Sequence, residues 1–246
     1  MKILITGASS GLGAELARQY ANPENELILL ARRQEKLYAL RSELFEQCKS
    51  VEVIVTDVSD FKALQKKIQT ISTLDMVILN AGVSLGNSRN REDIPTIEAF
   101  ENLYRVNVLA NHAILEVLLP LFKIQKSGKI VFISSLASLF SMPSSEIYSS
   151  SKRAINAYAE GIRYQYKAYG IKVLTILPGF IESEMTVDKD MKMPFIYPTQ
   201  EGVAKIKNAI DKGKEYYTFP KKIYFFIKFV NLLPMRVREK ILQLLS

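Results

Sequence analysis

The feature of this sequence that most restricts its fold is a regular alternation of short apolar runs with longer segments of helical period. Six runs rich in Ile, Val and Leu are typical of buried strands: Lys2–Ile5, Leu27–Leu30, Val51–Val55, Met76–Leu79, Lys129–Ile133 and Val173–Leu177. Each of the first five precedes a segment with helical spacing, and none shows the polar alternation of a half-exposed sheet. The pattern predicts the α/β class, with a doubly wound parallel sheet between two layers of helices.

The sequence predicts one domain with a C-terminal appendage. Its 246 residues suit a single α/β domain of the larger kind, and neither a repeat nor a low-complexity linker divides it. We therefore expect residues 1–215 to form the domain and residues 216–246 to form a helical C-terminal segment. A single cysteine, Cys48, excludes an intramolecular disulfide, and with one histidine, His112, we expect no metal site.

Positive charge is concentrated near the C-terminal end. The formal net charge is +8, which by itself would suit a nucleic acid, an acidic membrane surface or a phosphate-rich ligand. Residues 202–246 hold ten basic and three acidic side chains, so they carry +7 and the rest of the chain carries only +1. The segment contains no recognised nucleic-acid reader motif, and we expect no nucleic acid as a partner.

A glycine-rich turn follows the first apolar run. Thr6–Gly13 reads T-G-A-S-S-G-L-G and precedes a helical segment. Glycines between a strand and a helix let the backbone approach a pyrophosphate, whose charge the helix N-terminus stabilises, whereas an ordinary tight turn would explain only one of the three. Because ligands of doubly wound sheets lie beyond the carboxyl ends of the strands, we expect a dinucleotide here. The expected contacts are Gly7, Ser9, Ser10, Gly11, Leu12 and Gly13.

Two arginines follow the second apolar run. A site for NAD usually presents an acidic residue to the ribose 2′-hydroxyl, about 20 residues beyond the glycine turn. Arg32 and Arg33 stand at that place, and a guanidinium can bind a 2′-phosphate through two hydrogen bonds. The alternative is a solvated basic pair at the start of the next helix. The functional interpretation predicts NADP(H) in preference to NAD(H).

In the order of its motifs the chain resembles the short-chain dehydrogenase/reductase family, over about 200 of its 246 residues. Thr6–Gly13 resembles the family's T-G-x-x-x-G-x-G, and the resemblance implies a Rossmann-like fold with three α/β/α layers. It also implies further cofactor-binding positions near the adenine, beside the sheet and around the nicotinamide. These positions are Asp57, Val58, Asn80, Ala81, Gly82, Pro178, Gly179, Ile181 and Ser183.

The family also carries a catalytic Tyr-x-x-x-Lys pair with an upstream serine. The pattern occurs three times, where about one chance occurrence is expected: Tyr148/Lys152, Tyr217/Lys221 and Tyr224/Lys228. Pro220 argues against a helical pairing in the second pair, and the third lies in an apolar stretch without a nearby hydroxyl. Only Tyr148 follows a strand-end serine, Ser135, and begins a long helical run, in which residues four apart share a face.

The chemistry of hydride transfer requires such residues, because charge builds on the carbonyl oxygen and a proton must reach it. A free tyrosine has a pKa of about 10, but a nearby ammonium favours its phenolate. The resemblance implies that Tyr148 is the acid/base and that Lys152 also holds the ribose hydroxyls. It implies that Ser135 binds the substrate oxygen, and that Asn107 kinks its helix and holds a water in the proton path. For Ser135 the alternative is a capping role, which suits the neighbouring Ser134 better.

These residues predict an NADP(H)-dependent oxidoreductase that interconverts a ketone or aldehyde and its alcohol. The alternative is a catalytically silent dinucleotide-binding sensor or scaffold, but such proteins usually lack the tyrosine or the lysine. The family covers its substrate with the segment at about 180–198, and flexible apolar side chains there would suit a hydrophobic carbonyl, although core packing would also explain them. The apolar residues of this segment are Met185, Met191, Met193, Phe195 and Tyr197.

The C-terminal segment is both apolar and basic. On a helix, Lys221, Tyr224, Lys228 and Asn231 form one narrow polar stripe, and a second amphipathic segment follows Pro234. The apolar surface requires a cover, which could be the rest of the domain, a second subunit or a membrane contacted by residues 221–246. We favour the first two, and expect a cytoplasmic homo-oligomer, a dimer or tetramer, with peripheral membrane contact as the alternative.

Overall fold

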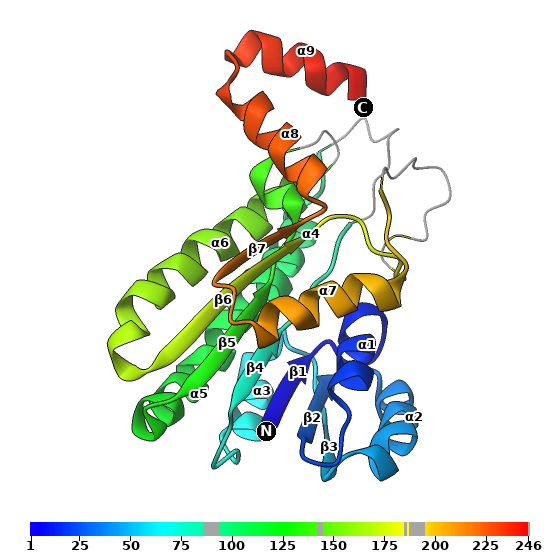
Figure 1. Ribbon diagram of the computed structural model, residues 1–246, viewed down its shortest axis with the longest axis vertical. Helices are drawn as coiled ribbons and strands as arrows, with labels where there is room; N and C mark the ends of the chain where they lie inside the picture. Colours follow the sequence, from blue (N-terminus) through cyan, green and yellow to red (C-terminus); the bar gives the residue numbers. More distant parts are fainter. Residues whose placement is uncertain (86–93, 142–144, 185, 187–194, 246) are drawn as a thin grey trace.

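A parallel sheet of seven strands forms the centre of the molecule in the computed structural model, which describes residues 1–85, 94–141, 145–184, 186 and 195–245 (Figure 1). Its strand order is β3-β2-β1-β4-β5-β6-β7. The strands are β1 (Lys2–Thr6), β2 (Glu26–Ala31), β3 (Ser50–Val55), β4 (Met76–Leu79), β5 (Gly128–Ile133), β6 (Ile171–Pro178) and β7 (Tyr216–Phe219). The first six confirm the predicted strands, with ends that differ by at most two residues.

Helices cover both faces of this sheet, as the alternation of the sequence predicts. One face carries α1 (Gly11–Tyr20), α2 (Gln34–Leu44) and α7 (Thr199–Asp211). The other carries α3 (Phe61–Ile68), α5 (Ala110–Gln125) and α6 (Glu146–Tyr166), with α4 (Ile97–Tyr104) packed against α6. Successive strand residues point to opposite faces. Ile3 and Ile5 therefore belong to the first hydrophobic cluster, and Leu4 belongs to the second.

The chain changes direction across the sheet at β1. Strands β2 and β3 lie on one side of it, and β4 to β7 lie on the other. Such a switch point opens a crevice at the carboxyl ends of the strands. Thr6, the last residue of β1, joins the two sides. Its buried hydroxyl donates to the carbonyl oxygen of Ile78 at 3.3 Å and accepts from the main-chain N–H groups of Asn80 and Ala81, each at 3.0 Å.

The seventh strand was not expected from the sequence. Residues 216–219 lie within the segment assigned to the appendage, but β7 pairs in parallel with β6 and completes the sheet. Arg163 of α6 fixes its beginning, because Nη2 donates to the hydroxyl of Thr175 at 3.0 Å and to the carbonyl oxygen of Glu215 at 2.9 Å. The appendage therefore begins only at α8 (Lys221–Leu232), which α9 (Met235–Leu245) follows.

Among the residues that the structure describes, one helical stretch is long and apolar enough to cross a membrane, judged by length and composition alone. It is Ile97–Gln125, which comprises α4, a π-helical turn η2 (Arg105–Leu109) and α5. Half of its most apolar window is buried inside the molecule. Leu115, Leu118 and Phe122 of this stretch belong to the hydrophobic cluster on the sheet, so here it serves as a core helix.

Candidate active site

The glycine turn between β1 and α1 consists of closely packed backbone. Gly7 and Gly11 have positive φ angles of 67° and 52°, which residues with side chains rarely adopt. A Cβ atom on Gly13 would lie 2.3 Å from the carbonyl oxygen of Gly7. Only glycine thus allows α1 to begin this close to β1, which places a helix N-terminus at the switch point and fits a pyrophosphate. The side chain of Leu12 packs on the core, which leaves its main chain for such a ligand.

A cluster of cations and hydroxyls borders this turn. Arg33 donates from Nε to the hydroxyl of Ser9 at 3.1 Å and from Nη2 to the hydroxyl of Ser10. Its Nη1 donates to one carboxylate oxygen of Glu184 at 2.7 Å, and Lys36 donates to the other at 2.5 Å. These bonds from Lys36 and Arg33 lower the pKa of Glu184 to about 2. The cluster therefore holds an anion between two cations and beside two hydroxyls, which is the arrangement a phosphate requires.

Arg32 has a different partner from Arg33. Its Nη1 lies 3.5 Å from Oδ2 of Asp57. Asp57 also accepts from the N–H and the hydroxyl of Ser59, at 2.9 and 2.7 Å. Burial opposes the ionisation of Asp57, but the bonds from Ser59 and the charge of Arg32 outweigh it and hold its pKa below the usual range. Arg32, Asp57 and the buried Val58 thus lie at the ends of β2 and β3, where the resemblance places adenine contacts.

The Asn-Ala-Gly segment at residues 80–82 joins the glycine turn to the catalytic helix. Asn80 donates from Nδ2 to the carbonyl oxygen of Thr6 at 3.0 Å. A Cβ atom on Gly82 would lie 3.5 Å from Nζ of Lys152. The segment therefore lies between the glycine turn and Lys152.

Tyr148 and Lys152 lie one turn apart near the beginning of α6. The side chain of Ser135 is near enough to that of Tyr148 to favour its phenolate, and Nζ of Lys152 lies 5.8 Å from the centre of the Tyr148 ring. Ser135 is also the N-cap of a short 3₁₀ helix, η3 (Leu136–Leu139), where its Oγ accepts from the N–H of Ala137 at 3.1 Å. The expectation that capping suits Ser134 better is therefore wrong: Ser135 is the capping serine, and Ser134 donates to the carbonyl oxygen of Lys152 at 3.3 Å. That Ser135 also binds the substrate oxygen stays a prediction.

Lys152 is a buried cation, with 6% of its surface exposed. Its Nζ donates to the carbonyl oxygen of Ile133 at 3.0 Å. Burial lowers the pKa of Lys152 to about 8. Burial also disfavours the charged form of Tyr148 and raises its pKa, although the nearby side chain of Ser135 acts to lower it. In the protein alone, both groups are therefore biased toward their neutral forms.

Asn107 lies in the π-helical turn η2, where the resemblance places a helix kink. Its Oδ1 accepts from the N–H of Val83 at 2.8 Å, and its Nδ2 donates to the carbonyl oxygen of Val83 at 3.0 Å and to the hydroxyl of Ser151 at 3.1 Å. Its main-chain oxygen accepts from Nδ2 of Asn111 at 2.7 Å. The side chain of Asn107 thus holds the loop after β4 in place. That Asn107 also holds a water in the proton path stays a prediction.

The end of β6 reaches over the glycine turn. Pro178 is the last residue of the strand, and Gly179 follows it against the end of β7. The side chain of Ile181 is buried in the core, which leaves only its main chain for a cofactor. Cβ of Ser183 lies 3.4 Å from a Cβ atom built on Gly11, so the segment after β6 contacts the expected phosphate site.

The predicted substrate cover is only partly within the described residues. Met185, Met191 and Met193 lie outside them. Phe195 is exposed, whereas the ring of Tyr197 packs on that of Phe219, with 5.7 Å between their centres. Tyr197 thus belongs to the core beneath α7.

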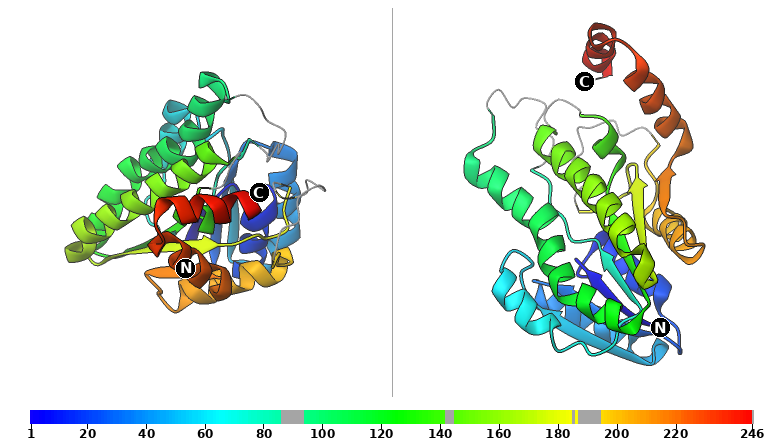
Figure 2. Two further views of the ribbon diagram at one scale, coloured as in Figure 1. Left: turned by 90° about the horizontal axis from the view of Figure 1, so that it is seen from above. Right: turned by 90° about the vertical axis from the view of Figure 1, so that its left-hand side faces the viewer.

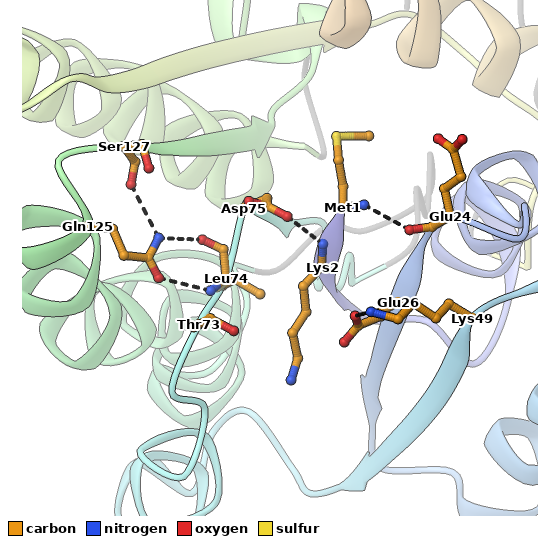
Figure 3. A pocket seen from close by; sticks show the side chains of 10 residues that line it. All are labelled: Met1, Lys2, Glu24, Glu26, Lys49, Thr73, Leu74, Asp75, Gln125 and Ser127. Carbon is orange, nitrogen blue, oxygen red and sulfur yellow. Dashed lines mark hydrogen bonds and ion pairs between the residues drawn. The ribbon is translucent and has the colours of Figure 1, made fainter.

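Two cavities lie away from this site. One of about 470 Å³ is at the amino ends of the strands, around Lys2 and Asp75 (Figure 3). Its polar groups are paired with one another: Asp75 accepts from the Lys2 N–H at 2.6 Å, and Gln125 bonds both main-chain groups of Leu74. The other, of about 550 Å³, lies beside Gly170 at the end of α6. In the described part of the chain, no three His, Cys, Asp or Glu side chains come together as metal ligands.

Four residues of the site were missed from the sequence. Lys36 and Glu184 complete the anion cluster, and Ser151 and Asn111 hold Asn107. Lys36 follows Arg33 by one helical turn, which is a usable signal. Glu184 lies 151 residues from Arg33, so no local pattern could have joined them.

The topology and the residues at its switch point define a class of protein, a dinucleotide-binding oxidoreductase. A family model described as "short chain dehydrogenase" matches residues 1–193. The chain therefore belongs to the short-chain dehydrogenase family, an oxidoreductase family that binds nicotinamide dinucleotides and acts on small molecules.

Individual relatives agree with this assignment. An uncharacterized oxidoreductase of Myxococcus xanthus is 32% identical over 94% of this chain and 92% of its own length. An 11-beta-hydroxysteroid dehydrogenase-like protein 2 of Arabidopsis thaliana is also 32% identical, over 94% of this chain and 77% of its own. Among solved structures, a short-chain dehydrogenase from Sphingobium yanoikuyae in complex with NADPH has a TM-score of 0.80 and 26% identity, covering 89% of this chain and 87% of that one.

Proposed function

We propose that this protein is an NADP(H)-dependent reductase or dehydrogenase that interconverts a hydrophobic ketone or aldehyde and its alcohol. The observation that carries the proposal is the grouping of Tyr148, Ser135 and Lys152 at the carboxyl ends of the strands. A hydroxyl beside a phenol, with a buried ammonium close to the ring, is suited to move a proton to a carbonyl oxygen.

Each residue of this group has a separate task in the proposal. A bound nicotinamide would supply or accept the hydride. Ser135 would donate to the substrate oxygen and hold it beside the phenol. Tyr148 would donate its proton to that oxygen in reduction and take it back in oxidation. Lys152 would lower the pKa of Tyr148 by its charge, which opposes the effect of burial.

The choice of NADP(H) rests on the anion cluster. Glu184 acts there as a stand-in for a phosphate, since its carboxylate accepts from both Arg33 and Lys36. A 2′-phosphate would replace this carboxylate and gain the hydroxyls of Ser9 and Ser10 as further donors. The complex of the Sphingobium relative with NADPH supports the same choice.

The hydrophobic substrate is supported by the residues next to Ser135. Leu136 and Phe140 are buried in one apolar cluster with Leu177. The name of the Arabidopsis relative also refers to a hydroxysteroid, a large apolar alcohol. A homo-oligomer, either a dimer or a tetramer, is part of the proposal because the family commonly assembles in this way.

The decisive experiment compares the wild-type protein with Tyr148→Phe. We expect the wild type to oxidise NADPH with carbonyls graded by chain length, faster than it oxidises NADH. We expect Tyr148→Phe to lose this turnover by at least about a thousandfold while binding NADPH with nearly unchanged affinity. Full activity of the variant would overturn the catalytic assignment. Tight NADPH binding without any turnover of the wild type would instead indicate the silent sensor or scaffold.

A further inference from the structure

The outer side of α8 is an exposed apolar surface. Phe225, Phe229 and Leu232 recur there at intervals of three and four residues and are 65%, 61% and 84% exposed. Phe226 and, at the beginning of α9, Met235 add to it. We call these five residues the outer apolar face. Soluble domains rarely leave so many large side chains together in water, so the face requires a partner outside the described chain.

The opposite, inner side of α8 packs against the domain, which determines that the outer apolar face points away from it. Ile227 and Val230 are buried in a cluster that includes Leu136, the residue after Ser135. Asn231 donates from Nδ2 to the carbonyl oxygen of Leu139 at 2.9 Å. Because α8 is held against the domain in this way, its opposite side must face outward. Figure 1 and the right-hand view of Figure 2 show α8 and α9, in orange and red, projecting beyond the body at the end of the molecule opposite the N-terminus.

The charge around the face is of one sign. Residues 221–246 hold six basic side chains and a single acidic one, Glu239. Lys221, Lys222 and Lys228 lie on α8 itself, and none of the three forms an ion pair with a carboxylate in the described part of the chain. Long basic side chains beside an exposed apolar helix face can reach phosphate headgroups while the apolar groups enter the lipid.

From these observations we propose that α8 and α9 dock this protein on the surface of an anionic phospholipid membrane. Each lysine or arginine near such a surface is attracted to the anionic headgroups, and burial of the outer apolar face adds to this attraction. A second copy of the chain fits less well. A symmetric contact places a face against itself, which would bring the three lysines of α8 against their own copies without a carboxylate between them.

Vesicle co-sedimentation of the full-length protein tests this proposal. The probes are vesicles of phosphatidylcholine alone and of phosphatidylcholine with an equal part of phosphatidylglycerol. We expect the wild type to sediment with the anionic vesicles, and the bound fraction to fall as salt rises, because screening weakens attraction between exposed charges. We expect Phe225→Ser/Phe229→Ser and, separately, Lys221→Gln/Lys222→Gln/Lys228→Gln to reduce binding by at least about tenfold.

The controls separate docking from folding and from self-association. Phe45→Ser removes an exposed phenylalanine outside the appendage and should bind vesicles like the wild type. Far-UV circular dichroism and NADPH binding should be unchanged in every variant. Wild-type protein that stays in the supernatant at low salt would overturn the proposal. So would a Phe225→Ser/Phe229→Ser variant that binds as the wild type does. A dimer that this variant converts to a monomer, without vesicle binding by the wild type, would identify a subunit interface instead.

Discussion

At the scale of single residues, the placement of charge decides what this site can bind. Arg33 donates hydrogen bonds to Ser9 and Ser10 of the glycine turn, whereas the neighbouring Arg32 forms an ion pair with Asp57. Two adjacent arginines that look equivalent in the sequence therefore have different partners in the structure. A 2′-phosphate would meet Arg33 directly, and Arg32 would border the adenine.

Glu184 should compete with the 2′-phosphate for the same cations. We expect Glu184→Gln to lower the KM for NADPH roughly three- to tenfold, as for the loss of one exposed charge interaction, and to leave the KM for NADH unchanged. Steady-state kinetics with both cofactors checks this. Glu182→Gln, two residues earlier and also exposed, is the matched control. An equal change for NADH would show that Glu184 acts on the fold of the segment and not on the phosphate.

Lys152 should impose a pH limit on cofactor use. Its ammonium is the required form, and burial lowers its pKa to about 8, so activity is present below that pH and lost above it. We expect kcat/KM for NADPH, which reports the free enzyme, to fall roughly tenfold per pH unit beyond about pH 8. Burial raises the pKa of Tyr148 in the protein alone, so we assign this limb to Lys152. A flat profile up to about pH 10 would contradict the prediction.

The grouping of the candidate catalytic residues could be predicted from the sequence because they lie within one helix turn or follow a strand end. Tyr148 and Lys152 share a face of α6 by spacing alone. The bonds of Asn107 could not be predicted, because they depend on a π-helical turn and on Val83, 24 residues away.

At the scale of elements, the approach of α1 to β1 should be sensitive to a single methyl group. In Gly13→Ala the new Cβ would meet the backbone of Gly7, at 2.3 Å from its carbonyl oxygen, so the helix must move away from the strand. We expect at least about a tenfold loss of NADPH affinity and a lower Tm.

Gly161→Ala is the control for this change, because no atom lies within 4 Å of a Cβ atom there. It lies inside α6, where alanine should stabilise the protein by about 0.5–1 kcal/mol. Calorimetry and fluorescence titration measure both effects. If Gly13→Ala and Gly161→Ala had the same Tm and the same NADPH affinity, the close approach of α1 to β1 would not depend on glycine at position 13.

The strands could be predicted where burial on both faces makes them continuously apolar, as in β4, whose four residues are all buried. The same criterion fails at β7. Its first residue, Tyr216, is exposed, and the strand has a neighbour on one side only. An edge strand of this kind is held in place by tertiary contacts, such as the hydrogen bonds of Arg163. Local sequence patterns do not reveal such contacts.

At the scale of the whole molecule, the net charge of +8 divides between two parts with different tasks. The domain that contains the site, residues 1–220, carries a net charge of +3, and the cations that border the site are Arg33, Lys36 and Lys152. The other +5 belongs to residues 221–246, which form α8 and α9. The sequence left open whether the domain, a subunit or a membrane covers this segment. The structure assigns the inner side of α8 to the domain, and only the outer apolar face requires a further partner.

This division predicts that the two sides of α8 respond differently to the same kind of substitution. Val230 is fully buried beside Leu136, whereas Leu232 is 84% exposed on the outer apolar face. We expect Val230→Ala to lower the free energy of unfolding by about 2 kcal/mol and Leu232→Ala to change it by no more than about 0.5 kcal/mol.

Because η3 carries Ser135 at its beginning and packs on the same cluster through Leu136, Val230→Ala should also lower kcat for carbonyl reduction. The KM for NADPH should stay the same, since the anion cluster at Arg33 belongs to other elements. Urea unfolding and steady-state kinetics measure both effects. If Val230→Ala and Leu232→Ala had equal small effects, α8 would not be joined to the domain in solution, and its outer apolar face would have no fixed direction.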